Sequence, residues 1–148
     1  MTTTPEKILE ANDTSRLFLI GDGAAFDFLS ELAGRIGYDE IHRTDAITAE
    51  STGGLGPLDH VVIAASDGRR AHQRLAAVLA AGDPGYLGLW SSEKDALTAL
   101  LKLSADRVSK ARLDRVVAPA GHSSGAQSAD ELAIVIAAEL VVARRRKH

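Results

Sequence analysis

Two glycines, at residues 21 and 23, lie where the chain could hold a negatively charged ligand. They follow a short apolar run at residues 17–20 and precede a stretch with apolar residues at helical spacing. Glycines between a strand and a helix permit a tight turn and a close backbone approach to a ligand, while the start of the helix presents N–H groups to an anion. Gly21, Asp22, Gly23 and Ala24 are therefore predicted to bind an anionic small molecule. The alternative is that the glycines serve only the turn.

The glycine pattern matches part of a dinucleotide-binding fingerprint. Gly21 and Gly23 occupy the first two glycine positions, but Phe26 stands where a small residue permits close packing of helix on strand. Asp22 adds a negative charge that would oppose a pyrophosphate. Asp45 lies 24 residues after Gly21, near the position of the acid that binds a ribose hydroxyl in such domains. Its alternative role is that of an ordinary loop aspartate.

Polar residues that follow the later apolar segments form a second set of predicted ligand groups. Parallel strands end at one edge of a sheet, so these residues are expected beside the glycine turn: Ser66, Asp67, Ser91, Ser92, Gly121, His122 and Ser123. His122 could bind phosphate or move a proton, but no partner acid is identifiable. The serines and Asp67 equally fit turns and helix starts. No catalytic residue is assigned, so a non-catalytic binding protein is expected.

Apolar runs and helical patterns alternate along the chain. Strands are predicted at 17–20, 40–44, 60–65, 86–90 and 115–118, with a glycine-rich loop at 51–57. Helices are predicted after the first strand, from Asp67 to about 81, from Ser91 or Ser92 to 103, and after a capping box at 128–131 to about 145, with a helical turn at 106–113. Five alternations predict an α/β, Rossmann-like three-layer sandwich, with helices on both faces of a parallel sheet.

The polar second strand is expected at an edge of that sheet. This placement predicts the strand order 2-1-3-4-5, with the ligand crevice between the carboxyl ends of strands one and three. Residues 1–15 are polar and are expected to form a flexible arm. Residues 16–148 are expected to form one domain, because a chain of this length can bury a single core.

Composition limits the remaining classes of function. The net charge of the 148 residues is −3, and the basic tail at 144–147 contributes +4, so the remainder stands at −7 and favours no nucleic-acid partner. The tail fits either an anionic partner or a helix end whose cations complement the backbone dipole. Without cysteine, and with scattered histidines, no metal site is predicted. No signal-like or membrane-spanning segment is recognised, so a cytoplasmic location without a membrane partner is expected.

The last predicted helix is apolar nearly all round. Between Leu132 and Ala143 only Glu139 interrupts the apolar residues. One face should pack on the sheet, and another face needs a different cover. A homodimer contact is one interpretation, and burial within the same domain is the other.

Three segments resemble the C-terminal Rossmann-type domain of the XdhC/CoxI family. Gly21 and Gly23 fit the first loop of the family, and residues 86–94 resemble its strand ending in glycine, serine and basic residues. The strongest similarity is at 113–145, where these residues fall in register: Pro119, Gly121, Gly125, Ala126, Glu131, Ala133 and Glu139. The sequence departs from the family at Ala24, where histidine is usual, at Glu93, where a basic residue is usual, and at 122–124.

The resemblance covers residues 16–146 and implies a function. Members of the family are accessory proteins for molybdenum-containing hydroxylases such as xanthine and carbon monoxide dehydrogenases. By this resemblance the chain would assist the maturation of a molybdenum hydroxylase by binding molybdopterin cofactor or a nucleotide. The residues themselves leave two alternatives open: an NAD(P)-binding oxidoreductase or nucleotide sensor, and an interaction module without a ligand.

Overall fold

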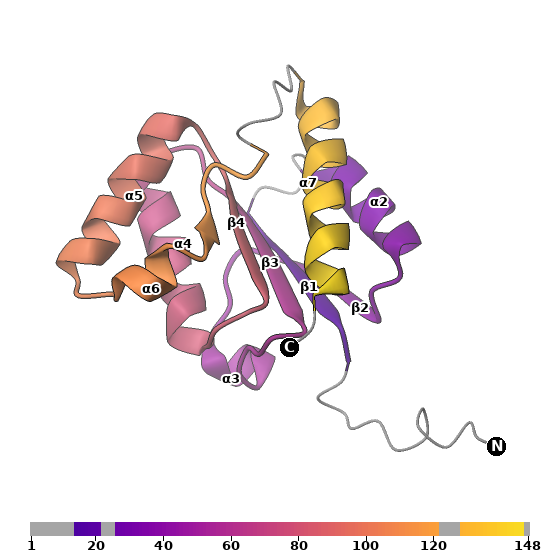
Figure 1. The fold of residues 1–148 in the computed structure, drawn as a ribbon, viewed down its shortest axis with the longest axis horizontal. Coiled ribbons are helices and arrows are strands. Elements are labelled where there is room, and N and C mark those ends of the chain that lie inside the picture. The colour runs from indigo at the N-terminus through magenta and orange to yellow at the C-terminus, as the bar shows by residue number, and fades with distance from the viewer. Residues whose placement is uncertain (1–13, 22–25, 122–127, 147–148) are drawn as a thin grey trace.

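The computed structural model describes residues 14–21, 26–121 and 128–146. Five parallel strands form one sheet in the order β2-β1-β3-β4-β5, as predicted. The strands are β1 (Arg16–Ile20), β2 (Glu40–Thr44), β3 (Asp59–Ala64), β4 (Tyr86–Trp90) and β5 (Val116–Val117). Helices α2 (Asp27–Ile36) and α7 (Ala129–Arg145) cover one face. The other face is covered by α3 (Ala49–Thr52), α4 (Gly68–Ala81), α5 (Glu93–Ala105) and α6 (Lys110–Leu113), so the predicted three-layer sandwich is confirmed (Figure 1).

Burial explains which strands are central. All six residues of β3 are buried, whereas β2 is largely exposed and polar, as its edge position requires. Side chains of the sheet enter two apolar layers, one under α4 and α5 and the other under α2 and α7. Within the described residues, none of the helices combines the length and apolar character needed to cross a bilayer.

Polar side chains begin three of the helices as predicted. Asp67, Ser92 and Ser128 accept hydrogen bonds from backbone N–H groups in the first turns of α4, α5 and α7, respectively. Such bonds satisfy donors that have no partner within the helix. The sequence signals for these helix starts are therefore local and reliable here.

Two element predictions need correction. The predicted loop at 51–57 begins inside helix α3, because Thr48 and Ser51 form a capping box through reciprocal side-chain and backbone hydrogen bonds. The predicted last strand at 115–118 shrinks to Val116–Val117. Pro119 cannot donate an N–H to a neighbouring strand, and pairing with β4 resumes only where the Ala120 N–H donates to the Leu89 carbonyl at 2.7 Å.

A partly buried ion pair connects α3 to the sheet. The Arg16 guanidinium donates to both oxygens of Asp59, at 2.8 and 2.9 Å, and to the backbone carbonyls of Thr52 and Gly54. Asp59 is only 5% exposed and also accepts the Gly56 N–H at 2.8 Å. This cluster lies at the amino ends of β1 and β3, so it stabilises the edge of the sheet opposite to the predicted ligand crevice.

Candidate functional site

The carboxyl ends of β1, β2 and β3 meet at a tight turn around Gly21. Gly21 has a φ of +131°, and its N–H donates to the Thr44 carbonyl oxygen at 2.9 Å. A Cβ atom at Gly21 would lie 2.6 Å from the Ala64 carbonyl oxygen and 3.0 Å from a guanidinium nitrogen of Arg74. Both the backbone conformation and the lack of space require glycine here. The other predicted loop residues, Asp22, Gly23 and Ala24, lie outside the described residues.

Two adjoining cavities open beside this turn, at the crevice predicted from the strand order. The smaller has a volume of about 270 Å³ and extends from the end of β1 along α4. The larger, of about 460 Å³, extends over the ends of β3 and β4. Both cavities are lined by Asp45, Arg70 and Arg74, so we describe them together as the carboxyl-edge pocket. The pocket lies where ligands bind in open parallel sheets.

Arg70 and Arg74 bring positive charge into the carboxyl-edge pocket. They are four residues apart on α4 and therefore lie on one face of the helix. Arg74 is half-buried, and its Nη1 donates to the Ala64 carbonyl oxygen at 2.5 Å, which fixes the guanidinium at the end of β3. The exposed Arg70 guanidinium makes no hydrogen bond or ion pair with any other described residue. Arg70 is thus the cation best able to receive a ligand.

The remaining lining of the pocket provides acceptor, hydroxyl and aromatic groups. Asp45 and Ser66 are exposed, and Trp90 is half-buried at the end of β4. Asp45 and the two arginines carry a formal charge of +1. An arginine can bind a phosphate or carboxylate through two parallel hydrogen bonds, a carboxylate can accept from hydroxyl groups, and an indole ring can pack against a planar ring. The pocket is therefore suited to an anion that carries polar or aromatic groups.

Phe26 belongs to the core and not to the pocket. Its side chain is 0% exposed, and its ring meets the Trp90 ring edge-on with centroids 5.9 Å apart. Phe26 is absent from the residues that line the two cavities. The aromatic ring thus occupies the third position of the glycine fingerprint without filling the carboxyl-edge pocket.

Three other predicted ligand residues have structural partners. Asp67 Oδ1 accepts the Arg70 N–H at 2.8 Å, and Ser92 Oγ accepts the Asp95 N–H at 3.1 Å, so both cap helices. The Ser91 hydroxyl donates to the Ser92 carbonyl at 3.0 Å. Unlike Asp45 and Ser66, these three residues do not line the two cavities. Their assignment to a ligand stays a prediction.

A partly buried chain of hydrogen bonds holds the start of the loop that follows β5. Glu139 of α7 accepts the Gly121 N–H at 3.0 Å with one carboxylate oxygen and the Tyr86 hydroxyl at 2.6 Å with the other. Burial is the main cause that raises the pKa of Tyr86 above its ordinary range, and the hydrogen bond to Glu139 is the second cause. Gly121 is therefore held against α7, while the predicted ligand residues His122 and Ser123 lie outside the described part of the chain.

The described histidines engage neighbouring side chains instead of forming a metal centre. His42 contacts Glu40 at 2.8 Å, His72 contacts Asp106 at 2.7 Å, and the buried His60 shares a 2.6 Å hydrogen bond with the Tyr38 hydroxyl. In the described ranges, no three His, Cys, Asp or Glu side chains gather in a way that could hold a metal ion.

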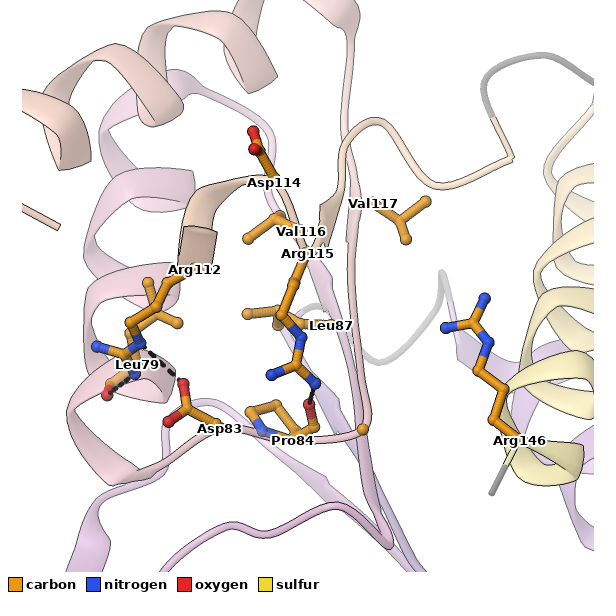
Figure 2. A pocket seen from close by; sticks show the side chains of 11 residues that line it. Leu79, Asp83, Pro84, Leu87, Arg112, Asp114, Arg115, Val116, Val117 and Arg146 are labelled. Carbon is orange, nitrogen blue, oxygen red and sulfur yellow. Dashed lines mark hydrogen bonds and ion pairs between the residues drawn. The ribbon is translucent and has the colours of Figure 1, made fainter. Parts of the chain in front are cut away.

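A further cavity, of about 330 Å³, lies at the opposite edge of the sheet, beside the amino ends of β4 and β5 (Figure 2). Arg112 lines it but is already engaged, since it donates to Asp83 at 2.8 Å and to the carbonyls of Leu79 and Gly82 at the end of α4. Arginine at this place satisfies carbonyl groups left open by the helix. We therefore assign a structural role to Arg112 and keep the carboxyl-edge pocket as the candidate site.

Sequence reasoning missed Arg70, Arg74 and Trp90 as pocket residues. The available signal was a pair of arginines four residues apart in the first turns of the helix that Asp67 caps after the central strand. A helix that starts at the carboxyl edge of the sheet begins beside the crevice, so some residues of its first turns can reach it. The signal was incomplete, because only the packing of α4 decides which of its arginines reach the pocket.

Comparisons with known proteins bear on the family and on the fold. The family model described as the XdhC Rossmann domain matches residues 17–140. Among solved structures, a xanthine dehydrogenase from Bacillus halodurans is similar, with 19% sequence identity and a TM-score of 0.65. The similarity covers 90% of this chain and 44% of that chain, so this chain spans less than half of that protein. No curated protein matches the sequence.

Proposed function

The chain belongs to the family of XdhC Rossmann domains, and from this membership we propose that it is a non-catalytic accessory protein for a molybdenum hydroxylase. In this proposal the carboxyl-edge pocket binds molybdopterin cofactor, whose phosphate is the anionic group, and the protein assists the maturation of its partner enzyme in the cytoplasm. The similarity to a protein described as a xanthine dehydrogenase supports this class of partner without identifying it.

The observation that carries the proposal is the Arg70 guanidinium, which has no partner among the described residues and lies in a pocket at the switch point of the sheet. Arg74 is fixed by the Ala64 carbonyl and supplies a second positive charge nearby. A charge-assisted hydrogen bond contributes about 1.5–3 kcal/mol, so loss of the Arg70 contact should weaken binding of an anion by about 10- to 100-fold. Asp45 and Trp90 provide a carboxylate and an indole ring for contacts with parts of the ligand other than its phosphate.

Binding can be followed with the fluorescence of the protein itself. Trp90 is the single tryptophan of the chain and lines the pocket, so a ligand there should change its emission. We expect molybdopterin cofactor released from a molybdenum hydroxylase to give a saturable change. The variant R70A should need about 10- to 100-fold more ligand for the same change.

Arg69 provides a matched control for that variant. Arg69 and Arg70 both lie in the first turn of α4, but only Arg70 lines the pocket. R69A should therefore retain the affinity of the natural protein. Equal losses in R69A and R70A would contradict the assignment of the pocket and indicate a general charge effect. A flat titration of the natural protein with the cofactor would contradict the ligand itself.

The role in maturation needs a test in the host. A strain that lacks this protein should produce its molybdenum hydroxylase with reduced cofactor content and reduced activity. Complementation with the natural gene should restore both properties, and complementation with the R70A variant should restore them only in part. Normal cofactor content in the deletion strain would overturn the accessory role.

A second candidate function is that of an NAD(P)-binding oxidoreductase or nucleotide sensor. The observation in its favour is that Asp45 lines both cavities, near the place where a ribose hydroxyl is bound in dinucleotide-binding domains. Titrations with NAD, NADP and their reduced forms at millimolar concentration separate this function from the first. A change that is lost in the variant D45N would favour the nucleotide.

A third candidate is an interaction module without a small-molecule ligand. Phe26 in the fingerprint and exposed apolar residues on α5 and α7 favour this possibility. Native mass spectrometry of protein purified from its host distinguishes it, because the method reports bound small molecules and subunit number together. A stoichiometric ligand would argue against the third candidate.

A further inference from the structure

The cavity beside the amino ends of β4 and β5 wraps around the open edge of the sheet, and we call it the amino-edge pocket. Strand β5 is last in the strand order, and no described strand pairs with its outer side. Val116 packs against the apolar layer under α4 and α5, whereas Val117 packs against the layer under α2 and α7. Both valines line the pocket, so it lies between the two helical layers, beside backbone groups that an edge strand leaves unpaired.

Two arginines enter the amino-edge pocket from different sides. Figure 2 shows Arg115, which directly precedes β5, and Arg146, which follows the last turn of α7 on the other side of the cavity. Leu87 and Val117 contribute apolar surface to the same cavity. The pocket therefore combines a positive charge on each of two sides with an apolar wall.

The carboxylates of the lining are already paired with other cations. The lining contains three arginines and two aspartates. Asp83 accepts from Arg112 at 2.8 Å, and Asp114 accepts from Lys110 at 2.7 Å. The positive charges of the other two arginines are therefore not neutralised within the lining.

Arg115 and Arg146 retain N–H groups for a ligand. Within the described part of the chain, the Arg115 guanidinium makes one hydrogen bond, to the Pro84 carbonyl oxygen at 3.4 Å, which is long for such a bond. The Arg146 guanidinium has no hydrogen-bond or ion-pair partner among these residues. Both arginines are exposed, and a guanidinium has five N–H donors, so each can receive a carboxylate through two parallel hydrogen bonds.

The described arginines of the basic tail differ in their surroundings. Arg144 donates to the Gly37 carbonyl oxygen at 3.2 Å and lies 4.6 Å over the Tyr38 ring, so it connects α7 to the end of α2. Arg145 is exposed and does not line the amino-edge pocket, whereas Arg146 does. Arg146 is therefore the arginine of this tail that is placed to meet an anionic ligand in the pocket.

We propose that the amino-edge pocket binds a small dicarboxylate, with one carboxylate on Arg115 and the other on Arg146. The short carbon chain between the carboxylates packs against Leu87 and Val117, whose side chains offer no polar groups. A phosphate ion has no apolar part that could use this wall. The volume of about 330 Å³ lies in the range of small-molecule sites.

The amino-edge pocket is separate from the carboxyl-edge pocket. Strand β4 begins at the first pocket and ends with Trp90 at the second, and five residues of a strand span roughly 13 Å. None of the described residues lines both pockets. The inference therefore does not rest on the proposed function, and the domain can hold both ligands together.

Nuclear magnetic resonance of the isotope-labelled chain tests the site, with succinate as the probe. At constant ionic strength, we expect saturable shifts of the backbone amide signals of Gly85 and Val117. R115Q and R146Q should each raise the dissociation constant of succinate roughly 3- to 10-fold, because each removes an exposed, charge-assisted contact. R145Q removes the same charge from the same end of α7, outside the pocket, and should leave the constant unchanged.

Two further probes test the recognition of both carboxylates. Succinamate carries a neutral amide in place of one carboxylate and should bind roughly 3- to 10-fold more weakly than succinate. Phosphate should also bind more weakly, because it cannot contact the apolar wall and both arginines together. Succinamate or phosphate with the affinity of succinate would contradict a site for a dicarboxylate.

The same spectra report where succinate binds and whether each variant is folded. R146Q changes an exposed residue at the end of α7, so it tests the proposal even if R115Q does not fold. The absence of saturable shifts at tens of millimolar succinate, or shifts confined to the carboxyl-edge pocket around Ala65, would overturn the proposal. Equal losses of affinity in R145Q and R146Q would also overturn it, since they would indicate a general effect of charge.

Discussion

Replacement of Gly21 by alanine tests the turn that defines the candidate site. The added Cβ would be 2.6 Å from the Ala64 carbonyl oxygen, whereas ordinary contacts begin near 3.4 Å. A φ of +131° is a conformation that costs about 1–3 kcal/mol for a residue with a side chain, and overpacking costs about 1–3 kcal/mol more. The smaller entropy of the unfolded alanine chain offsets about 0.4–1 kcal/mol. G21A should therefore lose about 1–5.5 kcal/mol in free energy of unfolding.

Gly34 provides a matched control, because the same substitution should have the opposite effect there. Gly34 lies within α2, and a Cβ at this position would meet no heavy atom within 4 Å. Alanine is favoured over glycine inside a helix by about 0.5–1 kcal/mol, so G34A should stabilise the protein. Urea unfolding of the three proteins, followed by circular dichroism, measures both changes. A G21A protein as stable as the natural chain would refute the reasoning.

Three further predictions follow from buried groups. Replacement of Asp59 by asparagine should cost about 2–3 kcal/mol in urea unfolding, since it weakens a partly buried ion pair, whereas D114N, at an exposed pair, should cost less than about 1 kcal/mol. Tyr38 and Tyr86 are the two tyrosines of the chain, and burial raises the pKa of both. A pKa that is raised in the folded state stabilises the fold fully below the ordinary tyrosine pKa, near pH 10, and this stabilisation is lost as the pH rises further. In an alkaline titration, phenolate absorbance should therefore appear only together with unfolding. F26A should cost about 3–5 kcal/mol in urea unfolding, because it leaves a void beside Trp90.

The fold was largely predictable from local patterns. The continuous apolar runs that became β3 and β4 could be buried only in the centre of a sheet, and the polar run at 40–44 could lie only at an edge. The strand order then followed from the alternation of elements. The errors occurred in the shortest elements. Helix α3 begins with a capping box of Thr48 and Ser51, and the glycines that follow at 53, 54 and 56 favoured the prediction of a loop. Strand β5 depends on pairing with β4, which is distant in sequence.

The candidate site was less predictable than the fold. Gly21, Asp45 and Ser66 could be placed at the crevice because each directly follows a strand. Arginines on an amphipathic helix are usually solvated, and nothing local distinguishes Arg70 from Arg69. The distinction arises only when α4 packs on β3, which turns one of these side chains toward the cavities. Sequence therefore located the edge of the sheet, and tertiary packing selected the cations.

The two sources of positive charge at this edge lead to different behaviour of a bound anion. An anion held by backbone N–H groups at the start of α2 would be insensitive to replacement of arginines in α4. An anion held by the exposed Arg70 would lose affinity in R70A and, because exposed charges are screened, would also lose affinity as salt concentration rises. Phe26 in the third fingerprint position favours the second case, since the fingerprint needs a small residue there for close approach of helix and strand. Titrations of the natural protein and R70A at low and high salt therefore separate recognition by α4 from recognition by the glycine turn.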